Sequence, residues 1–177
     1  MLARHPATAR RIVQRLASFF VSDNPPPALV ADLERSFLDS GGDIRFTLTT
    51  LVSSREFWQA DQLLFKTPFE FACSALAATG GLRNPKEAAL ALSFLSQAGQ
   101  PVHGWQTPDG YKTDTATWLS PEALTRRADF AVSLGNRGKT PAFLTAFLSA
   151  QSRQRIAREP DALQSGLMLS SPEFMRK

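Results

Sequence analysis

The sequence predicts an all-α protein, an irregular multi-helical array of about eight or nine helices. Three observations predict this fold class. Apolar residues recur at helical spacing through most of the 177 residues. Proline and glycine stand where these segments begin and end. Between them lies no run of alternating β-branched residues that would indicate a strand.

The first predicted helix covers residues 6–21 and places its apolar residues on one stripe: Ile12, Val13, Leu16, Phe19 and Phe20. His5 precedes Pro6, and we expect it to cap this helix. The prolines at 25–27 end the helix, because proline lacks the N–H that a helix interior needs.

The net charge of +4 lies entirely in the first 22 residues, which hold four arginines and neither Asp nor Glu. Such an acid-free, amphipathic start is compatible with a mitochondrial transit peptide. It lacks the continuous apolar run of a secretory signal, and a twin-arginine signal is poorly supported for the same reason. The apolar spacing favours a folded helix with a solvated basic face.

The later helices follow in order, each with its own start and stop signals. A helix over 27–40 ends at Gly41-Gly42, and Asp43 is expected to cap the next helix, whose inner face carries Ile44, Leu48, Leu51 and Val52. Further starts carry a proline at or near the first helical position: Thr67-Pro68, Asn84-Pro85, Ser120-Pro121 and Thr140-Pro141. Matching stops are supplied by Gly80-Gly81, Gly99 and Gly135.

Two segments of similar sequence predict two helix corners built in the same way. Taking Ser53 and Ser170 as N-caps places Glu56 and Glu173 at the third helical position, where each would complete a capping box. A catalytic role for either glutamate is the alternative.

One long loop near 100–118 interrupts the helical pattern and holds the best candidate site. It combines possible proton-transfer groups, His103, Asp109 and Asp114, with possible ligand-binding aromatic residues, Trp105, Tyr111 and Trp118. The alternative is that the aromatic residues pin the loop to the helices while Asp109 makes a turn. Both interpretations stay open.

Composition excludes several classes of site. The single cysteine excludes an intramolecular disulfide, and two histidines leave little material for a metal site, so no metal is expected. Cys73 is expected to be a buried, inert thiol, and Arg126-Arg127 to be part of a solvated face. No phosphate-binding glycine loop or nucleophile-elbow motif is present, so no cofactor is expected. Nucleic-acid binding is disfavoured, and no apolar run is long enough for a membrane span.

Several segments occur together in a pattern that resembles the bacterial family catalogued as domain of unknown function 1800. They are Leu2–Arg10, Phe20–Pro26, Gly41–Asp43, Ser53–Trp58, Lys66–Phe71, Gly99–Pro101, Thr107–Tyr111 and Trp118–Pro121. The resemblance implies that the chain corresponds to the C-terminal part of a longer architecture. It carries over no reaction, cofactor or catalytic residue.

We therefore expect one helical domain over 1–177 that acts as a scaffold or protein-interaction module. The alternative is an enzyme or a sugar- or peptide-binding cleft built around loop 103–118. The expected partner is another protein or the N-terminal part of the family architecture, with self-association possible through exposed apolar surface. The location would be cytoplasmic if Met1 is the genuine start, and exported if the chain is a fragment.

Overall fold

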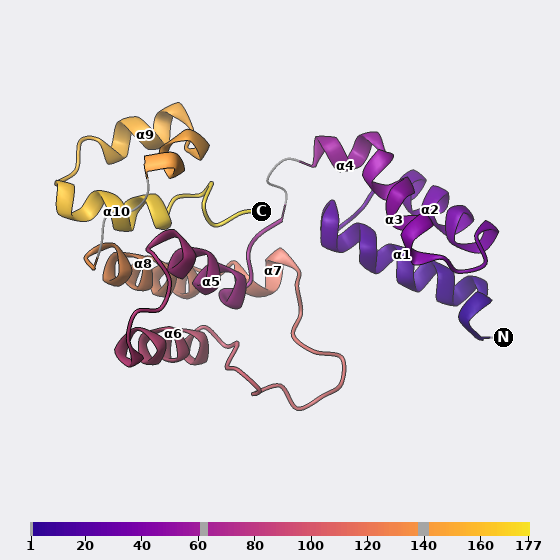
Figure 1. Ribbon diagram of the computed structural model, residues 1–177, viewed down its shortest axis with the longest axis horizontal. Coiled ribbons are helices and arrows are strands. Elements are labelled where there is room, and N and C mark those ends of the chain that lie inside the picture. Colours follow the sequence, from indigo (N-terminus) through magenta and orange to yellow (C-terminus); the bar gives the residue numbers. More distant parts are fainter. Residues whose placement is uncertain (1, 61–63, 138–141) are drawn as a thin grey trace. The chain divides into compact units, whose positions relative to one another are not determined.

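A computed structural model describes residues 2–60, 64–137 and 142–177 (Figure 1). In these residues the chain forms ten α-helices, two 3-10 helices and one isolated β-bridge, which confirms the all-α prediction. The chain divides into two compact units, Met1–Leu64 (unit 1) and Phe65–Lys177 (unit 2), and each is described by itself. The single domain expected from the sequence stays a prediction.

Unit 1 is built from short helices around a small apolar core. Its elements are η1 (Leu2–Arg4), α1 (Pro6–Phe20), α2 (Pro27–Asp39), α3 (Ile44–Ser53) and α4 (Arg55–Gln59). The centre of the core contains Val13, Leu33, Phe37 and Leu51, which come from α1, α2 and α3. The helical spacing predicted these core residues, but four other apolar residues expected on the same faces are 42% to 50% exposed: Phe19, Phe20, Ile44 and Val52.

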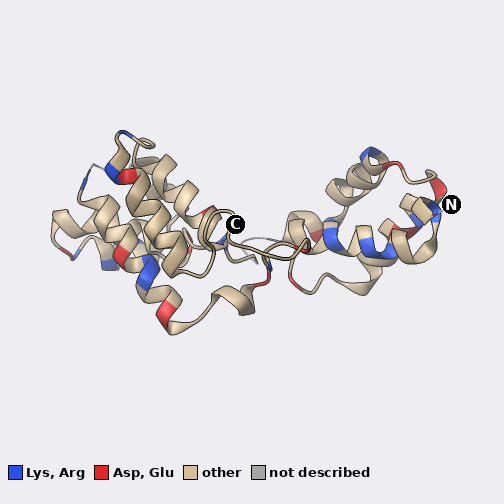
Figure 2. Ribbon diagram, turned by 90° about the horizontal axis from the view of Figure 1, so that it is seen from below, with Lys and Arg blue, Asp and Glu red and all other residues tan. Residues whose placement is uncertain are grey.

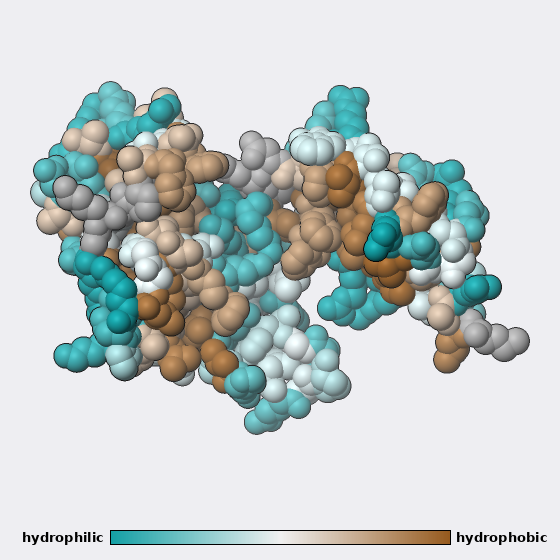
Figure 3. All heavy atoms as spheres, viewed as in Figure 1, coloured by the Kyte–Doolittle hydropathy of each residue, from teal (hydrophilic) through white to brown (hydrophobic). Residues whose placement is uncertain are grey.

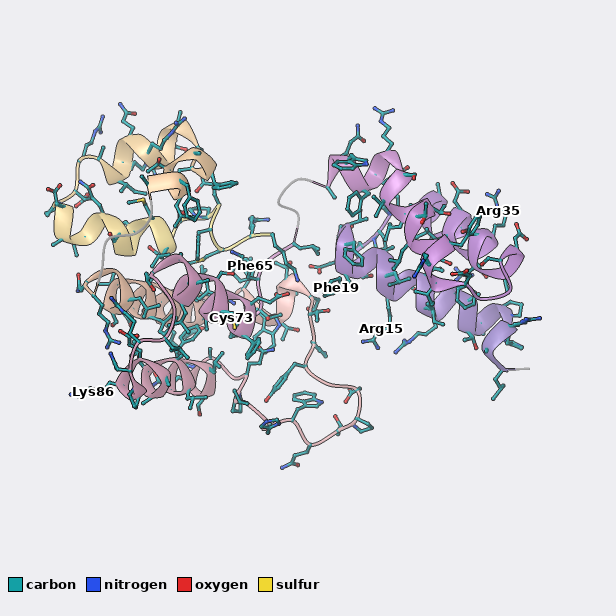
Figure 4. All side chains as sticks on the ribbon, in the orientation of Figure 1. Arg15, Phe19, Arg35, Phe65, Cys73 and Lys86 are labelled. Carbon is teal, nitrogen blue, oxygen red and sulfur yellow. The ribbon has the colours of Figure 1, made fainter. Side chains whose placement is uncertain are left out.

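Helix α1 is a folded helix with a basic outer face, as its apolar spacing predicts. Ala9, Val13 and Ala17 are fully buried, whereas the arginines on the other face are exposed (Figure 2). Arg15, labelled in Figure 4, is one of them. The expected cap is confirmed, since Nδ1 of His5 accepts a hydrogen bond from the backbone N–H of Ala7 at 3.2 Å.

The corner between α3 and α4 differs from the prediction by one residue. Ser54, rather than Ser53, is the N-cap of α4, and its hydroxyl accepts a hydrogen bond from the N–H of Phe57 at 3.2 Å. Ser53 instead completes the last turn of α3. The same shift occurs near the C-terminus, where Ser171 accepts the N–H of Phe174.

Unit 2 contains the remaining helices: α5 (Pro68–Ala78), α6 (Pro85–Gln97), α7 (Thr115–Trp118), α8 (Pro121–Gly135), η2 (Ala142–Phe147), α9 (Ala150–Ile156) and α10 (Asp161–Leu169). The starts at Thr67, Asn84 and Ser120 are confirmed, each by a side-chain oxygen that accepts a helix N–H. The expected start at Thr140-Pro141 lies outside the described residues. The predicted loop ends earlier than expected, because α7 begins at Thr115.

The core of unit 2 is rich in phenylalanine. The rings of Phe94 and Phe130 stack with their centroids 4.4 Å apart, and Phe71 lies within 6.3 Å of both. These residues come from α5, α6 and α8, so the aromatic cluster joins three helices. Trp118 of α7 is 7% exposed and belongs to the same core.

Helices α8 and α10 cross at two glycines. A Cβ built on Gly135 would lie 2.4 Å from the backbone nitrogen of Gly166, and one on Gly166 would lie 2.7 Å from Cα of Val132. Only glycine fits such a backbone approach. Gly135 was predicted as a helix stop, and it is indeed the last residue of α8, but it also serves this contact.

The end of unit 2 is tied back to its beginning, an arrangement that we call the tail clasp. Phe65 and Arg176 form an antiparallel bridge, and the N–H of Lys66 donates to the carbonyl of Met175 at 2.9 Å. Nζ of Lys66 donates to the carbonyl of Phe174 at 2.7 Å. Lys177 pairs with the carboxylate of Glu70.

Two predictions about burial are wrong. Arg127, expected on a solvated face, is 1% exposed, and its guanidinium lies between the rings of Phe65 and Phe71, 4.5 and 5.1 Å from their centroids. Cys73, expected to be buried, is exposed on α5, labelled in Figure 4. Residue type alone favoured the opposite in each case.

Candidate functional site

The predicted loop site begins with a turn that holds Trp105. The indole N–H of Trp105 donates to the carboxylate of Asp109 at 3.1 Å, and the hydroxyl of Thr107 donates to the same oxygen. Asp109 therefore orients an aromatic side chain from within the turn that it helps to form. Trp105 itself is 43% exposed.

The three aromatic side chains of the loop lie in sequence across it. The ring centroids of Trp105 and Tyr111 are 4.8 Å apart, and those of Tyr111 and Trp118 are 6.4 Å apart. The hydroxyl of Tyr111 donates to the carbonyl of Pro101 at 2.7 Å, and the indole of Trp118 donates to the carbonyl of Lys112 at 2.8 Å. Through these bonds, the side chains of Tyr111 and Trp118 hold the loop backbone at Pro101 and at Lys112.

The other two predicted side chains lie at separate places in the loop. Asp114 caps α7, because its carboxylate accepts hydrogen bonds from the N–H and the hydroxyl of Thr117 at 3.0 and 2.9 Å. Burial alone would raise the pKa of Asp114, but these hydrogen bonds outweigh it and hold the pKa below its ordinary value. His103 is exposed and has a left-handed backbone, with φ at +58°.

The loop therefore gathers Trp105, Asp109, Tyr111 and Trp118, while Asp114 and His103 have other surroundings. The hydrogen bonds from Trp105 and Thr107 to Asp109 stabilise the turn, and the hydrogen bonds from Thr117 to Asp114 stabilise the helix start. Chemically, this part of the loop offers an exposed aromatic surface beside an oriented carboxylate. Whether it binds a ligand stays a prediction.

A second exposed aromatic residue lies at the end of α4. Trp58 is 73% exposed, and its indole N–H donates to the carbonyl of Val52 at 2.7 Å. The ring of Phe57 meets it edge to face, with centroids 5.4 Å apart. The Trp58 ring is therefore held in one orientation although solvent surrounds most of it. The Ser53–Trp58 segment is visible in the sequence, but its residue types alone predict no role for Trp58.

Glu173 has a structural role that the sequence did not reveal. Its carboxylate accepts the backbone N–H of Ser149, the N-cap of α9, at 3.0 Å and the hydroxyl of Ser152 at 2.9 Å. Burial would raise the pKa of Glu173, but the hydrogen bonds from Ser149 and Ser152 lower it to about 2. The predicted local capping box is wrong, because the glutamate caps a helix 24 residues earlier.

Neither a cluster of metal-binding side chains nor a membrane-spanning helix occurs in the described residues. In residues 2–60, 64–137 and 142–177, no three His, Cys, Asp or Glu side chains form a group that could hold a metal ion. Nor does any helix of this part of the chain have both the length and the apolar character needed to cross a membrane.

Comparison with known proteins adds one finding. The family described as "Protein of unknown function (DUF1800)" matches residues 1–176. No curated protein matches the chain. No solved structure matches it either.

Proposed function

Because the chain belongs to the DUF1800 family of proteins of unknown function, which names no reaction, we propose from its own surface that it is a protein-interaction module. The observation that carries the proposal is the fixed and exposed side chain of Trp58. Tryptophan is the residue type most enriched among the side chains that dominate binding energy at interfaces. Its hydrogen bond to Val52 sets the ring orientation in advance, which lowers the entropy cost of binding.

Further apolar surface accompanies Trp58. Val52, whose carbonyl accepts the hydrogen bond from the Trp58 indole, is 44% exposed. In unit 2, Phe143 and Phe147 of η2 are 60% and 66% exposed. Figure 3 shows apolar residues in brown on the surface of both units. Contiguous exposed apolar surface is typical of binding sites, and the neighbouring Trp58 and Val52 supply such surface on unit 1.

The proposal predicts that the isolated chain associates with a second copy through Trp58 when no other partner is present. Sedimentation equilibrium over a wide concentration range measures this association. We expect the unaltered chain to form dimers at high concentration and Trp58→Ala to weaken dimerisation by about tenfold or more. The matched control is Trp105→Ala, which removes another exposed tryptophan.

The two outcomes are distinct. A chain that stays monomeric at every concentration would count against the proposal, as would dimers that Trp58→Ala leaves intact. Because Trp58 is mostly exposed, its loss is not expected to unfold unit 1, and circular dichroism checks this.

A second candidate function is ligand binding at the loop. The observation that favours it is the surface pair formed by Trp105 and Tyr111, beside the carboxylate of Asp109. Flat aromatic faces next to a polar group are typical of sugar- and peptide-binding surfaces. This candidate requires that ligand binding depend on Trp105.

A further inference from the structure

A groove on the surface of unit 1 has the composition of a ligand site and lies outside the predicted loop. Its volume is about 550 Å³, which is within the range of small-molecule sites. It is lined by side chains of α2, α3 and α4. Phe46, Thr49 and Ser53 of α3 share one helix face and form one side.

The groove presents an apolar platform. Phe46 is 54% exposed, so one of its ring faces is accessible to a ligand. Leu29 of α2, 3% exposed, contributes the apolar floor. A ring with an accessible face suits the C–H surface of a flat, partly apolar molecule.

The polar groups of the groove carry both charges. Glu56 and Asp32 supply two carboxylates, of which that of Asp32 is paired with Arg35 at 2.5 Å, and Arg55 supplies a guanidinium. A strongly cationic ligand would meet Arg55, whereas an anionic ligand would meet the two carboxylates. A neutral ligand with many hydroxyl groups avoids both conflicts, because a hydroxyl both donates and accepts hydrogen bonds.

The hydroxyl groups of α3 complete this set. Thr49 donates its proton to the carbonyl of Arg45 at 2.9 Å, so its oxygen faces a ligand only as an acceptor. Thr50 is tied to Ser36 at 2.9 Å, which fixes the wall of the groove against α2. Both side chains are therefore positioned before any ligand arrives.

From this combination of an accessible ring and mixed polar groups, we propose that the groove binds a neutral saccharide. A sugar ring would stack on Phe46, its hydroxyls would donate to Glu56 and Asp32, and Arg55 would donate to a ring or hydroxyl oxygen. The residues that line the groove belong to unit 1, whereas the aromatic residues of the loop belong to unit 2. Saccharide binding in the groove does not depend on self-association through Trp58.

Saturation-transfer NMR with the full chain tests this proposal, with cellobiose, maltose and N,N′-diacetylchitobiose as probes. We expect at least one of them to bind, and Phe46→Ala to raise its Kd about tenfold. Glu56→Gln, which keeps the shape of the side chain, should raise the Kd about fivefold. The matched controls are Phe147→Ala, another exposed phenylalanine, and Trp105→Ala in the loop, and neither should change the Kd.

Each other outcome would overturn the proposal. No saturation transfer to any of the three disaccharides excludes a saccharide site. Binding that survives Phe46→Ala, or that disappears with Trp105→Ala, places the ligand elsewhere. Binding of arginine methyl ester in place of the sugars, lost in Glu56→Gln, would assign the groove to a basic partner. Because Phe46 is 54% exposed, we expect Phe46→Ala to stay folded. Glu56→Gln measures the contribution of the groove to binding independently of that variant.

Discussion

Glu173 shows how one carboxylate can organise a distant helix. In a local capping box, the side chain at the third helical position accepts the N–H of the N-cap residue. In α9 that position is Ser152, which is too short for the task, and Glu173 supplies the carboxylate instead. The hydroxyl of Ser149 accepts the other hydrogen bond of the capping box, from the backbone N–H of Ser152 at 3.1 Å.

Replacing Glu173 with glutamine should destabilise unit 2 at neutral pH by about 1 to 2 kcal/mol, because the hydrogen bonds to the helix start lose the carboxylate charge that strengthens them. Thermal unfolding of Glu173→Gln measures this. Glu159→Gln, which changes an exposed glutamate after α9, is the control and should have little effect.

The acid dependence provides a second readout of the same prediction. Folding lowers the pKa of Glu173 from 4.5 to about 2, so its stabilising contribution is complete above pH 4.5 and is lost as the pH falls toward 2. The unaltered chain should therefore lose more stability than Glu173→Gln over that interval. If the free energy of unfolding fell equally with pH in both proteins, the hydrogen bonds of Glu173 would contribute nothing to stability.

Single residues were predictable where their partners are close in sequence. His5 and Asp43 were expected as caps and act as caps, because the N–H groups that they accept lie two and three residues away. Arg127 was not predictable, since its surroundings come from distant segments. Its guanidinium donates to the carbonyl of Lys66, 61 residues earlier.

Arg127 also shows what such burial costs. One of its terminal nitrogens, Nη1, is buried without a hydrogen-bond partner in the described residues. Burial lowers the pKa of Arg127 to about 10, although the nearby carboxylate of Glu70 opposes the change. The side chain stays charged at neutral pH and is stabilised by the two phenylalanine rings that enclose it.

Among the elements, the crossing of α8 and α10 should tolerate least change. Gly135→Ala would place a methyl group against the backbone of α10, which cannot move without separating the helices. We expect a loss of about 1 to 3 kcal/mol or more in the free energy of unfolding. Ser133→Ala in the same helix adds no atom and should cost little, and chemical denaturation compares the two variants.

The opposite ranking would be informative. A Cβ on residue 135 would lie 2.4 Å from the backbone nitrogen of Gly166, which is too close for two non-bonded atoms. If Gly135→Ala were nevertheless as stable as Ser133→Ala, the two helices would have to lie further apart than in this structure.

The long helices were predictable from the sequence, and so was the start of the short helix α4 to within one residue, but α7 was not. Helices α1, α2, α5, α6 and α8 carry a full apolar stripe and begin at or next to a proline, both of which are visible in the sequence. Helix α7 has four residues, too few to show a period, and lies inside the predicted loop. The sequence shows the residue types of the candidate site in that loop. It does not show that Trp105 bonds to Asp109 and Tyr111 to the carbonyl of Pro101, because both contacts depend on the folded backbone.

At the scale of the whole molecule, the buried apolar residues form two hydrophobic clusters, one in each unit. Phe37 is central to the core of unit 1 and Phe130 to that of unit 2, and each is 3% exposed. Phe37→Ala should reduce hydrogen-exchange protection in α1–α3 more than in α5 and α8, with Phe130→Ala giving the reverse. An equal loss in both units would support the single cooperative domain expected from the sequence.

The tail clasp has a consequence for synthesis of the chain on the ribosome. The bond between Lys66 and Phe174 spans 108 residues, so unit 2 cannot close until translation has passed its far end and Phe174 has left the exit tunnel. The contacts of unit 1 need only residues up to about 60 and can form while the rest is still being made. Between the synthesis of residue 60 and that of Phe174, the nascent chain therefore carries a unit 1 whose contacts are complete and a unit 2 whose clasp is still open.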